Sequence, residues 1–218
     1  MQTTIKIPYG RQHLNQKDID AVTESLNDPF ITRGPKVKLF EETISHACKV
    51  TYTVAFSSGT SALSAAYFAA GFSEGDRLIT TPNTFVATCA PAVTNRGHIE
   101  LVDIDPQTGN LSLEALQNHL RYRSLRQKTI VLPVHFSGVC IDMCALDQLI
   151  VDPNTCVIED GCHALGSTYP SGEPVGSCAY SAMTAFSFHP LKSITTGEGG
   201  AITTNSESLY KRLLLFRN

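Results

Sequence analysis

Hydrophobic positions along the chain follow two spacings, and each spacing predicts a different kind of element. Apolar residues three and four positions apart indicate amphipathic helices, as with Ile19, Val22 and Leu26. Short continuous apolar runs between turn residues indicate buried strands. Helices are predicted after Gln16, after Pro35, over residues 61–70, over 84–95, after Ser112, around 146–151 and over 206–217. Strands are predicted at residues 52–56, 77–80, 99–103, 130–134 and 155–159.

This alternation of short strands and helices is typical of βαβ units. The predicted fold class is therefore α/β, with a mainly parallel sheet flanked by helices. The segment 61–70 is alanine-rich and apolar on every side, so it should be a buried helix. The last predicted helix instead carries Leu209, Leu213 and Phe216 on one side. No later segment covers that side, so we expect it to be exposed and the isolated chain to be poorly soluble.

Composition narrows the class of protein. The chain has 218 residues, of which 42% are hydrophobic and 17% are charged, as in globular domains. Its formal charge of −3 argues against a protein that binds nucleic acid through many basic side chains. No apolar run approaches the roughly 18 residues of a membrane span, and the N-terminus lacks a signal-peptide pattern. The seven cysteines are therefore interpreted as reduced thiols of a cytoplasmic protein.

Three segments carry chemically useful residues at the ends of strands, where ligands collect in open parallel sheets. The first is Ser-Ser-Gly-Thr at residues 57–60, which opens the helix over 61–70. Free N–H groups at such a helix start can bind an anion. An ordinary helix cap would have the same sequence, and the lysine signature of a P-loop is missing.

The second segment is Glu-Asp-Gly-Cys-His at residues 159–163. Asp160 follows an apolar run, so its carboxylate could hold a protonated ring nitrogen, or it could cap a turn. No metal site is predicted at Cys162 and His163, because adjacent residues rarely face one ion and no standard ligand spacing is present.

The third segment, residues 187–200, contains one of the eight lysines of the chain. Lys192 lies among glycines and hydroxyl residues, and it could be a nucleophile or an exposed loop lysine. The glycines do not form a dinucleotide-binding motif, because Ile202 occupies the last position of Gly-x-Gly-x-x-Gly. An anion cradle, an aspartate for a ring nitrogen and a lysine are together the parts that pyridoxal 5'-phosphate (PLP) requires.

Seven ordered blocks resemble the nucleotide-sugar aminotransferases, a family of fold-type I PLP enzymes. They are Ile31-Thr32-x-Gly34, Phe40-Glu41-Glu42, and residues 58–63, 81–88, 102–105, 159–166 and 187–200. The resemblance extends from Ile7 to the end of the chain, and residues 164–169 and 194–196 are most similar to the pseudaminic acid branch. It implies transfer of an amino group from glutamate to a 4-keto sugar nucleotide, a UDP-linked 4-keto-6-deoxy-N-acetylhexosamine.

The resemblance also implies roles for single residues. Lys192 would bind PLP as a Schiff base and later move a proton, and Asp160 would pair with the pyridinium nitrogen. Phe85 would stack on the ring, and His163 would lie near its 3-hydroxyl. The phosphate would be held by Gly59, Thr60 and Ser187. The sugar nucleotide would lie near Tyr9, Pro29, Phe30, Ile31, Thr32, Gly59 and Ser187.

Members of this family are longer, dimeric enzymes. The resemblance therefore implies a homodimer and a missing small C-terminal domain. Residues 1–218 would form the PLP-binding large domain, with an N-terminal arm over about residues 1–35. An inactive truncated fragment that at most binds PLP or a partner chain is the alternative. A sugar dehydratase of the same fold is disfavoured, because those enzymes have histidine in place of Lys192.

Overall fold

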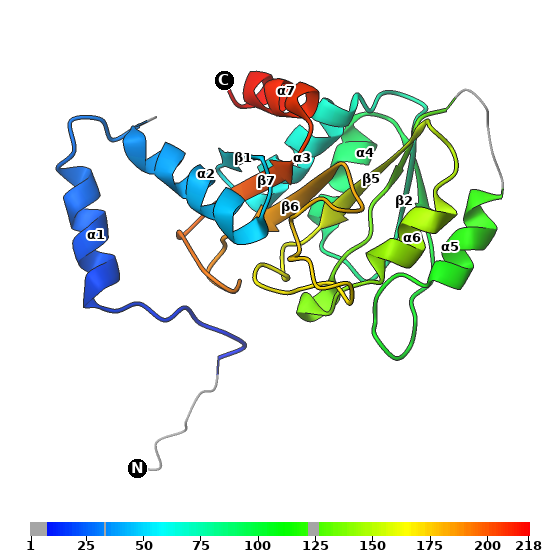
Figure 1. Ribbon diagram of the computed structural model, residues 1–218, viewed down its shortest axis with the longest axis horizontal. Coiled ribbons are helices and arrows are strands. Elements are labelled where there is room, and N and C mark those ends of the chain that lie inside the picture. Colours follow the sequence, from blue (N-terminus) through cyan, green and yellow to red (C-terminus); the bar gives the residue numbers. More distant parts are fainter. Residues whose placement is uncertain (1–7, 33, 122–126) are drawn as a thin grey trace, which may run out of the picture.

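The computed structural model describes residues 8–32, 34–121 and 127–218. Within these ranges, seven strands form one sheet with helices on both faces (Figure 1). The strands are β1 (Tyr52–Phe56), β2 (Arg77–Thr80), β3 (His98–Leu101), β4 (Thr129–Val131), β5 (Thr155–Asp160), β6 (Met183–Ser187) and β7 (Gly200–Thr204). The helices are α1 (Gln16–Leu26), α2 (Pro35–Cys48), α3 (Gly59–Ala70), α4 (Ala90–Thr94), α5 (Leu113–Leu120), α6 (Met143–Leu149) and α7 (Glu207–Arg217), with 3-10 turns η1 (Val86–Thr88) and η2 (Phe136–Gly138). No helix in the described ranges has the length and apolar character needed to cross a membrane.

The strand order across the sheet is β1-β7-β6-β5-β4-β2-β3. The five strands from β6 to β3 pair in parallel, whereas β7 is antiparallel to both of its neighbours. β1 therefore runs in the same direction as β6, and the carboxyl ends of all strands except β7 lie at one edge. The predicted α/β fold with a mainly parallel sheet is confirmed.

Each face of the sheet packs against its own hydrophobic core. Successive residues of a strand point to opposite faces. Ile158 accordingly belongs to the core formed with α3, α4 and α7, and its neighbour Val157 belongs to the core formed with α2, α5 and α6. The alanine-rich α3 contributes Ala62, Ala65 and Ala66, none of which is exposed. These small side chains let α3 lie close to β6 and β7.

Most predicted elements are confirmed, with ends shifted by a few residues, but the helix predicted over 84–95 is wrong. That segment forms η1 and the separate helix α4. Pro91 has no N–H to donate to an earlier turn, so one continuous helix cannot form through it. The helix predicted around 146–151 starts earlier, at Met143, and ends at Leu149. Strands β6 and β7 were not predicted.

The expectation that the last helix leaves an apolar side uncovered is also wrong. Leu213 of α7 is fully buried in the core shared with α3, and Leu209 is partly buried in the same core. Phe216 remains 41% exposed, but its ring centroid lies 6.4 Å from that of Phe56 and 5.4 Å from that of Phe68. Because the chain itself covers this side, the reason for expecting poor solubility from it no longer holds.

Helix α1 lies apart from the sheet, at one end of the molecule (Figure 1). It begins at a capping box in which Asn15 and Asp18 bond to each other's backbone N–H groups. The amphipathic helix predicted here is confirmed. Its apolar residues Ile19, Val22 and Leu26 are nevertheless more than half exposed, so the apolar side of α1 does not join either core.

Candidate active site

The carboxyl-end edge of the sheet brings the three predicted segments together. Gly200, the first residue of β7, pairs with Phe56 of β1 on one side and with Ser187 of β6 on the other. β5 ends at Asp160, which pairs with Ala185 of β6. The turn after β1, the turn after β5 and the loop after β6 therefore leave the same edge of the sheet.

Helix α3 starts at this edge with a complete cap. Ser58 Oγ accepts the Ser61 N–H at 3.1 Å, and Ser61 Oγ accepts the Ser58 N–H at 2.9 Å. The N–H groups of Gly59 and Thr60 belong to the first turn, where no acceptor exists inside the helix. Together with the positive end of the helix dipole, they suit an anion such as a phosphate.

Two glycines let β6 and β7 approach this helix start closely. A Cβ on Gly59 would lie 2.8 Å from Ser187 Cβ and 3.1 Å from Ser187 Oγ. A Cβ on Gly200 would clash with the carbonyl oxygen of Ser58. The Ser187 hydroxyl therefore lies beside Gly59, and Thr60 directly follows Gly59 in the chain. The three predicted phosphate-binding residues are thus neighbours.

Replacing Gly59 with alanine should weaken binding of a phosphate group at this position. The added methyl group must displace Ser187, because real Cβ contacts are not shorter than about 3 Å. We expect PLP to bind at least about tenfold more weakly, a loss of about 1.4 kcal/mol. Fluorescence titration with PLP measures the effect. Gly75→Ala is the control for backbone strain alone, because Gly75 has a positive φ, its added methyl group would meet no neighbouring atom, and it lies at the opposite edge of the sheet. Equal PLP affinity in both variants would contradict the assignment.

Asp160 is held at the end of β5 with only 5% of its surface exposed. Its Oδ2 accepts a hydrogen bond from Thr88 Oγ1 at 2.8 Å, and its Oδ1 accepts the Cys162 N–H at 3.1 Å. Thr88 ends the η1 turn, whose cap is Phe85. Phe85 is 70% exposed, so η1 connects a buried carboxylate to an exposed aromatic residue.

Electrostatics connect His163 and Lys192 with Asp160. Partial burial lowers the pKa of His163, the Lys192 charge lowers it further, and the Asp160 carboxylate opposes both. Burial raises the pKa of the Cys162 thiol, and Asp160 raises it further while Lys192 lowers it. Lys192 and Asp160 thus act on the same two residues. His163 Nδ1 accepts the Ser137 N–H at 3.3 Å, so the neutral ring carries its proton on Nε2.

An open groove of about 530 Å³ lies between the N-terminal arm and the loop after β6. Tyr9 lines the groove from the arm, and Lys192 lines it from the loop. Gly10 lets the two segments approach, since a Cβ there would lie 2.9 Å from Leu191 Cδ2. One predicted substrate-binding residue, Tyr9, is thus near Lys192.

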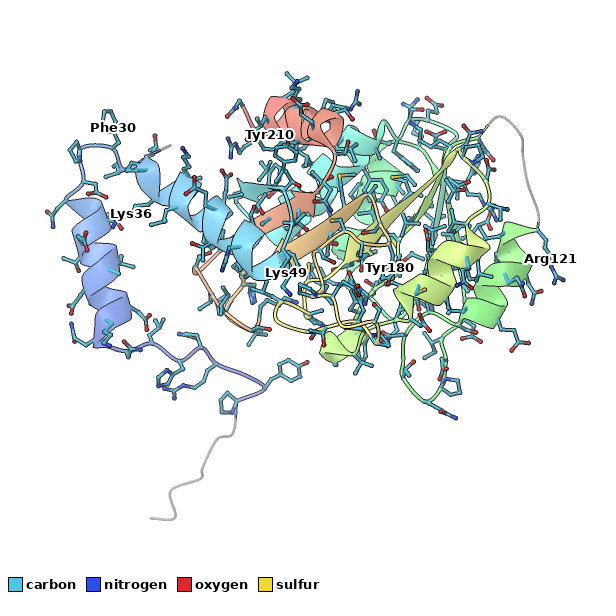
Figure 2. All side chains as sticks on the ribbon, in the orientation of Figure 1. Phe30, Lys36, Lys49, Arg121, Tyr180 and Tyr210 are labelled. Carbon is cyan, nitrogen blue, oxygen red and sulfur yellow. The ribbon has the colours of Figure 1, made fainter. Side chains whose placement is uncertain are left out.

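Four other predicted substrate-binding residues lie away from this groove. Pro29, Phe30, Ile31 and Thr32 are exposed in the loop between α1 and α2. Phe30 lies at the outer edge of the molecule, away from the sheet (Figure 2). Both Phe30 and Ile31 are 71% exposed. This chain alone does not bring them to Lys192.

A buried polar cluster beside the site was not predicted from the sequence. Glu159 is fully buried, and its Oε2 accepts hydrogen bonds from His135 Nε2 and Tyr169 Oη, both at 2.7 Å. Its Oε1 accepts hydrogen bonds from the hydroxyls of Ser181 and Thr184. Four donors around one carboxylate connect β5 to β6 and to the segments after β4 and β5. No sequence spacing relates these partners, although Glu159 itself stands in a recognised block.

Replacing Glu159 with glutamine should destabilise the fold most at neutral pH. Burial alone would raise the pKa of Glu159, but the hydrogen bonds and charge of its partners lower it below its usual 4.5. The stabilisation is therefore complete above about pH 4.5 and is lost as the pH falls through the lowered pKa of the folded state. We expect a loss of at least about 2 kcal/mol at pH 7, because the amide group faces buried donors.

Urea unfolding at pH 7 and under acidic conditions measures this difference. The exposed Glu74 supplies the control variant Glu74→Gln, which should change stability little at either pH. A stability difference between the unchanged chain and Glu159→Gln that grows on acidification would contradict the assigned role.

The chain matches known proteins over nearly its whole length. The sequence profile of the DegT/DnrJ/EryC1/StrS aminotransferase family matches residues 12–218. A UDP-4-amino-4,6-dideoxy-N-acetyl-beta-L-altrosamine transaminase of Campylobacter jejuni is 39% identical over 212 residues, which are 97% of this chain and 55% of that protein. The transaminase of the same name from Helicobacter pylori is 34% identical over 96% of this chain and 54% of its own length.

Solved structures of sugar aminotransferases are also similar to this chain in fold. PseC of Helicobacter pylori, an aminotransferase involved in the biosynthesis of pseudoaminic acid, superposes with a TM-score of 0.87 at 32% identity, covering 97% of this chain and 55% of its own. A Streptococcus pneumoniae sugar aminotransferase in its PLP form has a TM-score of 0.87 at 27% identity, over 97% of this chain and 57% of its own. The chain spans about half the length of the curated relatives it matches. By sequence and by fold, it belongs to the DegT/DnrJ/EryC1/StrS aminotransferase family.

Proposed function

We propose that this chain carries the cofactor site of a PLP-dependent aminotransferase that moves an amino group from glutamate to a 4-keto sugar nucleotide. The observation that carries the proposal is the meeting of a capped helix start, a buried aspartate and a loop lysine at one edge of the sheet. A lysine and an acidic partner for the pyridinium nitrogen are what PLP needs from a protein.

The residues present fit PLP. Gly59 and Gly200 let Ser187 and the Ser58 carbonyl pack against the start of α3, because a Cβ at either position would clash. Thr60 and Ser187 would add hydroxyl donors for the phosphate. Asp160 offers a carboxylate to the ring nitrogen, and Phe85 offers its exposed ring face. When bound, PLP supplies an electron sink for the carbon that loses its proton.

The chain's own residues would supply positioning and proton transfer. The Asp160 carboxylate holds a proton at the ring nitrogen, and the Nε2–H of His163 can donate to an oxygen on the ring. The Lys192 amine, once free, can move a proton between neighbouring substrate atoms as a general base and acid. The lowered pKa of His163 keeps this donor neutral at neutral pH.

The sugar nucleotide assignment is supported by the relatives, which include altrosamine transaminases. Tyr9 lies in the groove beside Lys192, where a substrate could approach. The exposed loop containing Phe30 and Ile31 could reach the site of a second copy, in accordance with a homodimer. In this proposal the chain acts as the PLP-binding large domain.

Two half-reactions on the purified chain test the proposal. PLP should bind and show the visible absorbance of covalently attached cofactor, glutamate should remove that absorbance, and a UDP-linked 4-keto-6-deoxy sugar should restore it. Binding of PLP without any response to glutamate would instead support the inactive fragment. Absence of PLP binding would overturn the proposal.

A further inference from the structure

The hydroxyl group of Thr88 is buried between two other polar groups of the site. Thr88 is fully buried at the end of η1. Its Oγ1 lies 2.8 Å from Asp160 Oδ2 and 2.6 Å from Thr84 Oγ1. An ionised carboxylate can only accept, so the single hydroxyl hydrogen of Thr88 goes to Asp160. The hydroxyl of Thr84 must then donate to Thr88.

The backbone of Thr88 is fixed as well. Tyr67 of α3 is fully buried, and its hydroxyl donates to the carbonyl oxygen of Thr88 at 2.7 Å. The Thr88 N–H donates to the carbonyl oxygen of Phe85 at 3.0 Å, which closes the turn. With its main chain held from two sides, the Thr88 side chain keeps its direction toward Asp160.

Thr88 and the N–H of Cys162 together define the plane of the Asp160 carboxylate. Both carboxylate oxygens have a donor, since Thr88 Oγ1 donates to Oδ2 and the Cys162 N–H donates to Oδ1. A carboxylate held by one donor alone can rotate about its Cα–Cβ and Cβ–Cγ bonds. When both oxygens accept hydrogen bonds, the remaining lone pairs of the carboxylate point in fixed directions. A hydrogen-bond partner that is itself fixed in position requires this.

We propose that Thr88, supported by Thr84, is a positioning residue that orients the Asp160 carboxylate toward the ring nitrogen of the cofactor. The inference rests on the proposed function, because it requires a ring nitrogen beside Asp160. It adds Thr84 and Thr88, which lie in a different segment from Asp160, as residues that set how strongly the ring nitrogen holds its proton.

The test follows the ring proton itself. The unchanged chain and its variants are loaded with PLP labelled with ¹⁵N in the ring, and the nitrogen chemical shift is recorded against pH. In Thr88→Val the pKa of the ring nitrogen should be about one unit lower than in the unchanged chain, which means that the nitrogen binds its proton about tenfold more weakly. Thr88→Ser keeps the hydroxyl and should titrate like the unchanged chain. Thr84→Val should shift the titration in the same direction by less.

Thr80→Val is the matched control. Thr80 is also a fully buried threonine whose hydroxyl makes one hydrogen bond, to the carbonyl oxygen of Leu132 at 2.7 Å. Thr80→Val removes a comparable buried hydrogen bond that does not involve Asp160, so the titration of the ring nitrogen should stay unchanged. An equal shift in Thr80→Val and Thr88→Val would show a general structural effect and overturn the assignment.

A second measurement needs no cofactor. Unfolding of the unloaded chain is compared for Thr88→Val, Asp160→Asn and the double variant. The two changes should be coupled by about tenfold in the unfolding equilibrium constant, as for a hydrogen bond to a charged group, whereas Thr80→Val and Asp160→Asn should be additive. Additive effects of Thr88→Val and Asp160→Asn would overturn the proposal.

The outcomes separate this inference from the proposed function. If the unchanged chain binds no PLP, the proposed function fails and the positioning role fails with it. If PLP binds and Thr88→Val leaves the ring titration unchanged, the role of Thr88 fails while the proposed function stands.

Discussion

Replacing Lys192 with alanine should abolish covalent attachment of PLP and lower the transamination rate by at least about 10⁴-fold, because in the proposed site one amine both carries the cofactor and moves the proton. No other described lysine is placed to substitute. Lys128 donates to the carbonyl oxygens at the end of α3, and Lys211 pairs with Glu207 on the outer side of α7. The visible absorbance of the PLP-loaded chain and the glutamate half-reaction measure the two losses.

Lys211→Ala is the control for this substitution. Lys211 is exposed, so its removal should leave the absorbance and the half-reaction unchanged. A Lys192→Ala variant that keeps both signals would exclude Lys192 as the attachment point.

Replacing Asp160 with alanine should lower the turnover rate far more than cofactor affinity. The carboxylate is buried and both of its oxygens accept hydrogen bonds, so in the proposed site it would act as a preorganised charge opposite the ring nitrogen. Loss of such a group typically costs about 3 kcal/mol or more, a factor of about 10²–10³ in rate. The phosphate cradle at α3 is untouched, so PLP affinity should fall by less than about tenfold. Single-turnover kinetics with glutamate and a PLP titration separate the two effects.

Asp147→Ala, on an exposed position of α6, controls for general effects of removing a carboxylate and should behave like the unchanged chain. Unchanged turnover in Asp160→Ala would remove Asp160 from the site. A loss of affinity as large as the loss of rate would instead assign it to binding alone.

Much of the fold could be predicted because most strands have apolar, β-branched or leucine residues at their centres. β2 and β4 are buried along their whole length, and their apolar pairs Leu78-Ile79 and Ile130-Val131 stand out in the sequence. β6 and β7 are buried as well, but they contain Thr184, Thr203 and Thr204, whose hydroxyls find partners inside the fold. In the sequence, a threonine reads as polar even when its hydroxyl will form a hydrogen bond with a distant residue inside the fold. These two strands were therefore not predicted.

The covering of α7 could not be predicted for a related reason. Its apolar side meets Phe68 and the rest of α3, which precede α7 by more than half of the chain. Spacing within one helix shows that a face is apolar, but the partner depends on how the sheet orders its strands. β7 carries the chain back beside β1, and this places α7 next to α3.

The site was predictable where its residues follow strands directly. Gly59 follows β1 closely, Asp160 ends β5, and parallel strands bring their carboxyl ends to one edge. The supporting bonds were not predictable, because Thr88 and Asp160 are 72 residues apart and no spacing rule relates them. Pro29 and Thr32 are exposed and do not line the groove at Lys192, so we propose that they contribute to the site of a second copy.

Borohydride reduction of the PLP-loaded chain tests whether the loop after β6 supplies the lysine of a PLP site. Reduction fixes the cofactor to the amine that holds it, and peptide mapping by mass spectrometry then identifies that amine. We expect a single modified peptide with the label on Lys192. A label on Lys128 or on any other lysine, or no label at all, would contradict it.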